Sequence, residues 1–370
     1  MPKRPNRYAT TLMGHGVCAQ KRSMPLPRVS RVVSPLPPSP PSPSPEELRR
    51  QAELERELKM ARDLQQGLLL EAAPHLPGWE ISAVSIPALD LGGDLYDFLP
   101  LRKGEHGIMI GDVSGKGLAA ALRMAVARTV FRYAARRGES PGLTLAAVNR
   151  GVLSEIPQGM VTMLYVTLDL NAGQLCLANA GHTFPLLING QVTELELSGL
   201  PLGVDGDSDY EETSALIAHG DTVFFYTDGV VEALNASEEV FGFEHLQEVL
   251  ATLADLKPRA MMSRLLHELR AWSGGSLKSD DVTMVVIRRR LAHLYAELHS
   301  IVYDVLGKER TVPFWAELAT EGLLPVTEDN ADQWIEALPA ITRYAQSRFG
   351  RGLARELQQQ IRLAIEDYRM

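Results

Sequence analysis

The feature that most constrains the fold is a series of short apolar runs between residues 76 and 290, several of which end at an aspartate. The runs are WEISAVSI, HGIMIGDV, VTMLYVTLDL, GQLCLANAG, FPLLIN, DTVFFYTDG and DDVTMVVIRRR. Many of their residues are β-branched or aromatic, and short turns separate them, which predicts β-strands. Two longer stretches, 118–137 and 260–272, have helical composition and are followed by glycines. Adjacent strands with inserted helices indicate an α+β layered domain rather than repeated βαβ units.

The segments before this region differ from it in composition. Residues 1–45 contain no acidic residue and end in SPLPPSPPSPSP, so we expect a disordered, basic and Pro-rich tail. Residues 46–74 are predicted to be a helical linker, with a helix at 46–71 that begins after Pro45 with two glutamates. An apolar seam with heptad spacing runs along it through Leu54, Leu58, Ala61, Gln65 and Leu68. The pattern fits equally a helix that packs on its own domain and one that joins two copies or relays a signal.

The chain is predicted to end in a helical appendage of unknown role at 292–370, after a strand-rich domain at 75–291. Two apolar stripes at helical spacing support this: Leu291, Leu294, Leu298, Ile301, Val302 and Val305, and then Leu353, Leu357, Ile361 and Ile365. Trp315 and Trp334 lie between the stripes. Nothing in the appendage resembles a catalytic motif, and it lacks the Asn- and Gly-rich boxes of a histidine-kinase-like ATPase.

The bulk properties exclude several classes of protein. The formal net charge of −9 argues against a general nucleic-acid binder. Cys18 and Cys176 are too few for a disulfide framework or a zinc site, which fits a reducing, cytoplasmic setting. No stretch approaches the roughly 20 apolar residues of a membrane-spanning helix. No apolar block follows the basic N-terminal residues, so we expect no secretory signal.

The stretch GDVSGKG at 111–117 looks like a phosphate-binding loop but does not fit one. A P-loop has four residues between two glycines, followed by Lys and then Ser or Thr. Here three residues separate Gly111 from Gly115, and a glycine follows Lys116. The GGDLY stretch at 92–96 also lacks the residues that follow the aspartate of a diguanylate cyclase. A nucleotide-binding kinase or cyclase is therefore not expected.

Acidic residues occupy four positions where a predicted strand begins or ends. They are Asp94 and Asp97 in LGGDLYDF, Asp112 after GIMIG, Asp228 after TVFFYT, and Asp280 with Asp281 before VTMVVIR. Carboxylates that converge at one edge of a sheet repel one another unless a cation neutralises them. Oxygen ligands suit Mg²⁺ or Mn²⁺, and two such ions can activate water and bind a phosphoryl group. A single Asp-Gly pair is a common turn, so the inference rests on the joint pattern.

The order of these motifs resembles the SpoIIE-like branch of the PPM, or PP2C-type, metal-dependent protein phosphatases. The resemblance runs from about residue 65 to residue 287 and includes LQQGLL, PALDLGGDLYDF, GDVSGKGLAAAL, NAGHTFPLL, GLPLGV, FYTDGVVEALN and DDVTMVVIR. It implies an α-β-β-α sandwich with two central sheets flanked by helices. It also implies that 75–291 is a phosphatase domain that hydrolyses phosphoserine or phosphothreonine on proteins.

The same resemblance implies a centre of two Mn²⁺ or Mg²⁺ ions that activates water for in-line attack on phosphorus. The implied ligands are Asp94, Asp112, Asp228, Asp280 and the backbone carbonyl of Val113. Asp112 would bridge both ions, Asp228 and Asp280 would hold the first, and Asp94 would act on the second. Asp112 and Asp228 are the implied catalytic residues. Asp281 stays an alternative to Asp280, because the sequence does not fix which of them turns inward.

Two features depart from the classical eukaryotic members. Ser114 stands where those proteins have a histidine that is a candidate general acid. Those proteins also have a phosphate-binding arginine before the first acidic motif, whereas here no Arg or Lys lies between residues 79 and 101. Lys116 and Ser114 are therefore candidates for contact with the substrate phosphate. His182 in NAGH is a candidate acid, although a histidine in a tight turn is more often structural. A cysteine-based phosphatase is excluded, because Met24 and His182 occupy the positions where its arginine would stand.

The substrate class implied by the resemblance is a STAS-type anti-sigma-factor antagonist in a partner-switching pathway that regulates a sigma factor. No nucleic-acid partner is expected, and a homodimer through the helix at 46–71 is an open alternative. A second hypothesis is a catalytically inactive protein that keeps the fold and binds regulatory partners. The four acidic positions favour the enzyme, because a binding module has no reason to keep carboxylates that repel one another.

Overall fold

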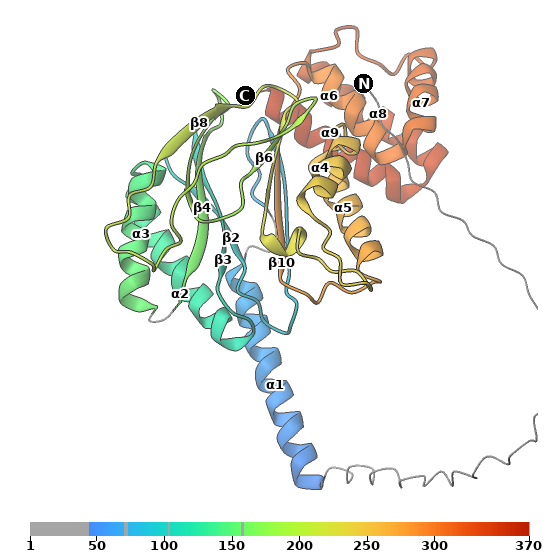
Figure 1. Cartoon of the computed structure of the whole chain (residues 1–370). Coiled ribbons are helices and arrows are strands. Elements are labelled where there is room, and N and C mark those ends of the chain that lie inside the picture. Colours follow the sequence, from blue (N-terminus) through green and yellow to red (C-terminus); the bar gives the residue numbers. More distant parts are fainter. Residues whose placement is uncertain (1–43, 70–72, 103, 157–158, 370) are drawn as a thin grey trace, which may run out of the picture. The chain divides into compact units, whose positions relative to one another are not determined.

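The computed structural model describes residues 44–69, 73–102, 104–156 and 159–369 (Figure 1). The chain divides into two units, residues 1–50 and 51–370. The predicted tail at 1–45 lies outside the described residues, except for its last two positions. None of the helices in the described part combines the length and the apolar character needed to cross a membrane.

Two five-stranded antiparallel sheets form the centre of the second unit. The first sheet has the strand order β1 (Trp79–Ile86), β10 (Val282–Arg289), β9 (Thr222–Tyr226), β6 (Leu186–Ile188) and β7 (Val192–Glu194). The second has the order β2 (Leu95–Pro100), β3 (Glu105–Val113), β4 (Val161–Asp169), β5 (Gln174–Ala180) and β8 (Glu212–Leu216). In both sheets every paired neighbour is antiparallel, which agrees with the short turns of the sequence.

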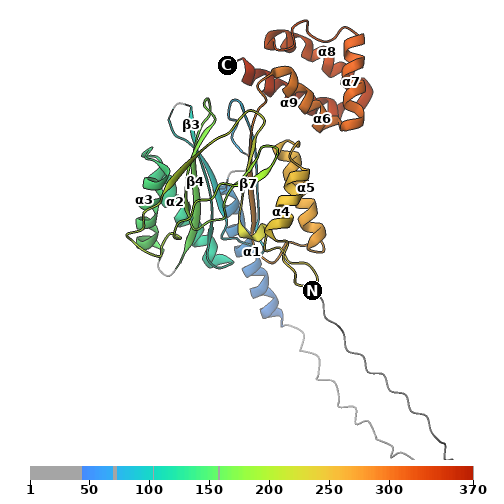
Figure 2. The ribbon, with the colours of Figure 1, turned by 45° about the horizontal axis from the view of Figure 1, so that its top comes forward.

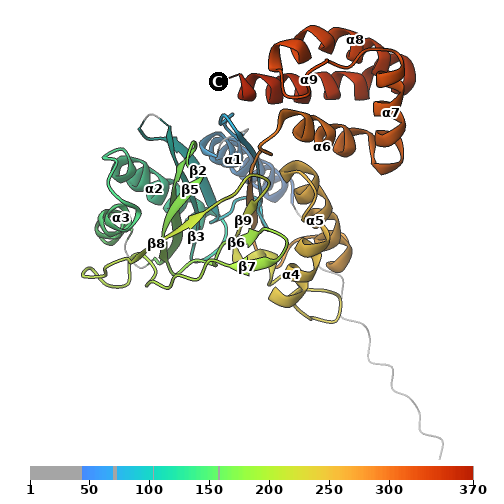
Figure 3. The ribbon, with the colours of Figure 1, turned by 90° about the horizontal axis from the view of Figure 1, so that it is seen from above.

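A pair of helices covers the outer face of each sheet (Figure 3). Helices α2 (Leu118–Ala135) and α3 (Pro141–Glu155) pack on the second sheet, and α4 (Phe243–Thr252) and α5 (Pro258–Trp272) on the first. Between the sheets lies a further core that includes Phe98, Ile110, Leu164, Val223, Phe225, Val285 and Ile287. The predicted α-β-β-α sandwich is confirmed. Burial on both faces explains why the strand runs are continuously apolar rather than alternating.

The sandwich contains two strands and two α-helices that the sequence patterns do not predict, namely β7, β8, α3 and α4. Strands β7 and β8 lie at sheet edges and are largely solvent-facing, so they carry little apolar signal. Helix α3 begins at Pro141 after Ser140, a start signal hidden in the apparent turn ESPG. The helix predicted at 118–137 ends at Ala135, and the one predicted at 260–272 begins earlier, at Pro258.

The last four helices pack on one another as a bundle with its own core (Figure 2). They are α6 (Leu294–Leu306), α7 (Lys308–Thr320), α8 (Ala331–Phe349) and α9 (Arg351–Tyr368). Most of the predicted apolar stripe residues are buried in this core, and Trp315 and Trp334 meet there edge to face with ring centroids 6.0 Å apart. The helices of 292–370 are therefore present. The domain boundary at residue 291 stays a prediction.

A buried ion-pair network joins the bundle to the sandwich. The Glu297 carboxylate on α6 contacts Lys257, Arg290 at 3.0 Å and Arg288 at 3.5 Å. Glu80 on β1 contacts the same three cations at 2.9, 3.0 and 3.1 Å. Burial favours the neutral form of Glu297, but the three cations outweigh burial and lower the pKa of Glu297 to about 2. The docking of the bundle is thus specified by charge as well as by shape.

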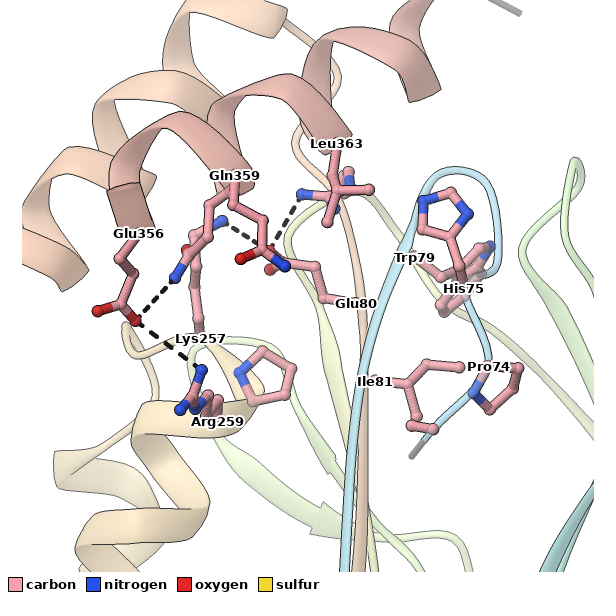
Figure 4. A pocket seen from close by; sticks show the side chains of 14 residues that line it. Pro74, His75, Trp79, Glu80, Ile81, Lys257, Arg259, Glu356, Gln359 and Leu363 are labelled. Carbon is pink, nitrogen blue, oxygen red and sulfur yellow. Dashed lines mark hydrogen bonds and ion pairs between the residues drawn. The ribbon is translucent and has the colours of Figure 1, made fainter. Parts of the chain in front are cut away.

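A cavity of about 340 Å³ lies beside this network (Figure 4). Glu356, Gln359 and Leu363 of α9 line one wall, and Trp79, Glu80 and Ile81 of β1 line another. Asp367 closes the network from α9, with its carboxylate 2.7 Å from Arg290 and 3.1 Å from His75. Of the three cations of the network, Arg288 lies near the C-terminal end of β10, Arg290 follows that strand directly, and Lys257 precedes α5.

The linker helix α1 (Pro45–Leu68) ends three residues before the predicted helix end, and residues 70–72 lie outside the described part. Within the second unit, Gln65 donates to the Gly92 carbonyl at 2.6 Å and accepts from the Gly92 amide at 3.2 Å. Arg62 donates to the Asp90 carbonyl at 3.0 Å. One side of α1 thus packs on its own domain. Met60 and Leu64, which are not in the predicted seam, are exposed.

Candidate functional site

The two sheets bring their acidic strand ends together. Asp112 lies near the end of β3, where it pairs with Thr162 of β4, and Asp94 immediately precedes β2, whose first residue pairs with Gly111. Asp228 follows β9 and begins a short 3₁₀ turn, while Asp280 lies two residues before β10. A hydrogen bond links the two groups, because the hydroxyl of Thr227 donates to Asp94 Oδ2 at 2.8 Å across the sheets.

The carboxylates lie close enough to perturb one another. Burial raises the pKa of Asp94 well above its usual value, and the charge of Asp112 adds to the effect. Burial, followed by the charges of Asp228 and Asp280, raises the pKa of Asp112 to about 7. Burial and the charge of Asp280 likewise raise the pKa of Asp228. Asp94 is buried, and Asp112 and Asp228 are half-buried. A cluster of such carboxylates with raised pKa values is typical of a functional site that binds a cation.

Asp280 and Asp281 have different surroundings. Both oxygens of Asp281 accept backbone N–H groups, from Ala88 at 2.7 Å and from Gly93 at 2.6 Å. Asp281 therefore holds the loop that leads into Asp94. Asp280 faces Lys116, whose Nζ lies 2.9 Å from Asp280 Oδ2. The charges of both aspartates act on Asp112, and that of Asp280 also acts on Asp228, so the difference between them lies in the two N–H groups that Asp281 already accepts. The surroundings favour Asp280 over Asp281 as a ligand.

Because Gly93 has no side chain, it leaves room for two oxygens of the implied metal ligands. A Cβ atom at residue 93 would lie 2.6 Å from the Val113 carbonyl oxygen and 3.2 Å from Asp112 Oδ1. Only glycine tolerates this approach without a shift of the backbone. Asp112 Oδ1 and the Val113 carbonyl thus lie beside the same small space, next to Asp94.

The donor set fits a hard divalent cation by its chemistry. It consists of carboxylates and one carbonyl, which are the ligands that Mg²⁺ and Mn²⁺ prefer. Burial, and after it the charges of neighbouring aspartates, raise the pKa values of Asp94, Asp112 and Asp228, and a bound cation would relieve the repulsion among these carboxylates. In the part of the chain that the structure describes, however, no three His, Cys, Asp or Glu side chains are already arranged to hold an ion. The chemistry, rather than a closed coordination shell, supports the metal assignment.

The candidate phosphate contacts lie on the loop after β3. Lys116 also donates to the carbonyl of Ser279, so it spans from this loop to the residue before Asp280. The Ser114 hydroxyl accepts from the Met160 amide at 3.1 Å, and Arg123 donates to the Ser114 carbonyl at 3.4 Å. Ser114 is therefore engaged with its neighbours, whereas Lys116 contacts the acidic cluster directly.

His182 lies behind the cluster rather than in it. It is buried, and its Nδ1 lies 2.9 Å from the Thr162 hydroxyl, whose residue pairs with Asp112 in the sheet. Asn179 accepts from the His182 amide at 2.8 Å and donates to its carbonyl at 2.9 Å. Burial lowers the pKa of His182 to about 4, so the imidazole is neutral near pH 7. These surroundings favour a structural role over that of an acid.

Two further residues belong to the site although the sequence analysis does not single them out. Thr227 bridges to Asp94, and Glu232 lies one turn after Asp228, to whose carbonyl its amide donates at 2.9 Å. Burial and the charges of Asp228 and Asp280 raise the pKa of Glu232. The spacing of four residues between Asp228 and Glu232 in DGVVE is the sequence feature that could have identified Glu232. Asp97, in contrast, is fully buried between Arg128 at 3.1 Å and Arg132 at 2.8 Å and is structural.

Comparison with known proteins agrees with this arrangement. Residues 102–290 match the family model described as Stage II sporulation protein E (SpoIIE). Phosphoserine phosphatase RsbU of Bacillus subtilis is 29% identical over 248 residues, which cover 65% of this chain and 72% of RsbU. Protein IcfG of Synechocystis is 30% identical over 265 residues, which cover 63% of this chain and 41% of IcfG.

Solved structures share the fold. The SiaA-PP2C domain of Pseudomonas aeruginosa superposes with a TM-score of 0.60 at 21% identity, covering 66% of this chain and 99% of that domain. The RsbU and RsbW domains of Rv1364c from Mycobacterium tuberculosis give a TM-score of 0.54 at 29% identity, covering 60% of this chain and 63% of that protein. Both matches leave about a third or more of this chain uncovered.

Proposed function

This chain belongs to the SpoIIE family of PP2C-type protein serine/threonine phosphatases, and we propose that it hydrolyses phosphoserine or phosphothreonine on a protein with two Mn²⁺ or Mg²⁺ ions. One observation carries the proposal. Asp94 and Asp112 from one sheet meet Asp228 and Asp280 from the other, with pKa values of three of them raised by burial and by one another.

Each residue has a role in this proposal. Asp112, Asp228 and Asp280 would hold the ions with help from the Val113 carbonyl, and Asp94 would act on the second ion directly or through water. When bound, such ions supply an activated water and neutralise the charge that develops on the phosphate oxygens. Thr227 fixes Asp94 by its hydrogen bond, and Asp281 fixes the loop before it. Lys116 places an ammonium group at the edge of the cluster, where a substrate phosphate would arrive.

A phosphorylated antagonist of an anti-sigma factor is the proposed substrate class. The support is that RsbU and RsbP of Bacillus subtilis are phosphoserine phosphatases, and that the Mycobacterium relative contains an RsbW domain beside its RsbU domain. We place this chain in a partner-switching pathway on those grounds, with a STAS-type protein as the substrate.

Pairing of two copies through α1 is a further part of the proposal. Leu54, Met60 and Leu64 on this helix are 56%, 65% and 73% exposed, and Met60 and Leu64 are one turn apart. Large apolar side chains at this spacing on one helix are typical of a surface that packs against another helix.

Phosphate release from a phosphoserine peptide, with and without Mn²⁺, tests the activity in the wild type and in Asp228→Asn. We expect turnover that requires the metal and falls by at least about a hundredfold in the variant, because a ligand of the first ion loses its charge. Equal turnover in both proteins, independent of Mn²⁺, would end the phosphatase proposal. No turnover in a folded protein that binds Mn²⁺ would favour the inactive regulatory alternative.

A further inference from the structure

An apolar groove lies directly beside the acidic cluster. It has a cavity volume of about 520 Å³. Ala88, Gly117 and Asp90, which is paired with Arg62, line part of it, and five further residues line the rest: Leu58 of α1, Leu89 and Leu91 of the loop before β2, Leu118 of α2, and Lys278. We refer to these five residues as the apolar groove. The groove is formed by four segments that are far apart in the sequence, which the fold brings to one place.

The walls of the groove expose large apolar side chains. Leu89 is 58% exposed and Leu118 is 50% exposed. The exposed face continues along α2 through Leu122, at 62%, and Val126, at 36%, each one turn beyond the last. Single exposed leucines are ordinary, but a contiguous apolar strip around a hollow is typical of a surface that binds another protein.

The position of the groove indicates which protein covers it. Leu118 is two residues after Lys116, whose Nζ contacts Asp280, and Lys278 is two residues before Asp280. Two residues of extended chain span at most about 7 Å. A protein that presents a phosphoserine to Asp112, Asp228 and Asp280 must therefore lie across the rim of the groove. The exposed ammonium of Lys278 adds a positive charge to that rim.

We propose that the apolar groove docks the protein substrate. It would accept one or two apolar side chains that lie near the phosphoserine on the substrate, with an acidic group of the substrate near Lys278. Recognition of the substrate is then separate from the chemistry: the groove contributes to substrate affinity, and the aspartates contribute to turnover. This inference rests on the proposed phosphatase function.

Peptides test the inference without knowledge of the natural substrate. Two phosphoserine peptides of equal length and charge are compared, one with leucines three to five residues from the phosphoserine on both sides, and one with serines there. The small substrate para-nitrophenyl phosphate, which cannot reach the groove, reports the chemistry alone. The proteins are the full chain, Leu89→Ser, Leu122→Ser, and the matched control Leu216→Ser, which alters a leucine that is 69% exposed on the edge strand β8.

We expect the wild type to prefer the leucine peptide by about tenfold in kcat/KM, mainly through KM, as partial burial of a leucine allows. Leu89→Ser and Leu122→Ser should reduce this preference severalfold, while turnover of para-nitrophenyl phosphate stays within about twofold. Leu216→Ser should behave as the wild type. Two independent variants guard against a local folding defect in one of them.

The inference is overturned if the wild type turns over both peptides with Mn²⁺ and shows no preference for the leucine peptide. It is also overturned if Leu89→Ser and Leu122→Ser keep the preference of the wild type. If sedimentation shows that Leu89→Ser and Leu122→Ser convert a dimer into a monomer and leave the preference intact, the groove is covered by a second copy instead. Absence of Mn²⁺-dependent turnover of any substrate would contradict the phosphatase proposal itself, which distinguishes the two failures.

Discussion

The ammonium of Lys116 lies 2.9 Å from Asp280 Oδ2, so a positive charge of the chain itself already contacts one of the proposed metal ligands. Burial and the charge of Asp280 raise the pKa of Asp228, and the charge of the same ammonium offsets only part of that rise. A divalent cation that binds Asp280 must therefore compete with Lys116 for the same carboxylate oxygen. We propose that the displaced lysine side chain is then available to a substrate phosphate.

We expect Lys116→Gln to bind Mn²⁺ about two- to fivefold more tightly than the wild type, because the competing ion pair is gone. This factor corresponds to the loss of roughly 0.5–1 kcal/mol, which is the contribution of a partly exposed ion pair. Calorimetric titration with Mn²⁺ measures the affinity, and Lys278→Gln, which removes a nearby lysine outside the cluster, is the control. Unchanged or weaker binding in Lys116→Gln would show that the lysine does not compete with the ion.

Asp280→Asn and Asp281→Asn should fail in different ways. We expect Asp280→Asn to lose Mn²⁺ affinity by at least about tenfold and to keep its melting temperature, because its carboxylate faces the cluster. Asp281→Asn should lower the melting temperature instead, because an amide cannot accept two N–H groups as the carboxylate does from Ala88 and Gly93. Calorimetry and thermal unfolding of metal-free protein separate the two effects. Asp280 is not the metal ligand if Asp281→Asn loses Mn²⁺ affinity and Asp280→Asn lowers the melting temperature instead.

Glu297→Gln should destabilise the protein by about 3 kcal/mol near pH 7, because three buried cations lose a shared carboxylate. Since the pKa of Glu297 is lowered to about 2 in the folded state, its contribution is present above its usual value of 4.5 and is lost as the pH falls from there to about 2. Urea unfolding at a series of pH values measures the difference. Glu309→Gln, at an exposed position of α7, is the control. A difference that does not shrink in acid would argue against the network.

Leu64→Lys should separate a dimer that pairs through α1, because a charge at the centre of an apolar contact cannot be solvated there. Sedimentation velocity of the full chain measures the change from dimer to monomer. Leu143→Lys, which alters a leucine of α3 that is 61% exposed, is the control and should leave the dimer intact. A wild type that is monomeric at high concentration would refute the pairing directly.

The buried strands and their aspartates could be predicted from the sequence because both signals are local. The composition of an apolar β-branched run such as VTMVVIR favours a strand by itself, and the acidic residues next to such a run can be read directly from the sequence. The edge strand β8 and the helix α3 could not be predicted, because a half-exposed strand and a helix that starts inside ESPG have weak local patterns. Their structure is set by the sheet and core against which they pack.

The acidic members of the proposed site could be named from the sequence, but their hydrogen-bond partners could not. The choice between Asp280 and Asp281 depends on which carboxylate reaches the amides of Ala88 and Gly93, about 190 residues away in the sequence. The bridge from Thr227 to Asp94 joins two different sheets, so no spacing rule could find it. The seam predicted along α1 is a similar case. Gln65 is its polar member, and its side chain is used to bind the backbone of Gly92.

The ion-pair junction also bears on how this enzyme can be dissected. A shortened protein that stopped after residue 291 would keep Lys257, Arg288 and Arg290 and would lose Glu297 and Asp367, leaving Glu80 as their counter-ion in the network described above. Such a fragment would expose these cations to solvent, and we expect it to bind polyanions nonspecifically during purification. A minimal catalytic unit should therefore be engineered with neutral residues at those three sites, or retain the last four helices.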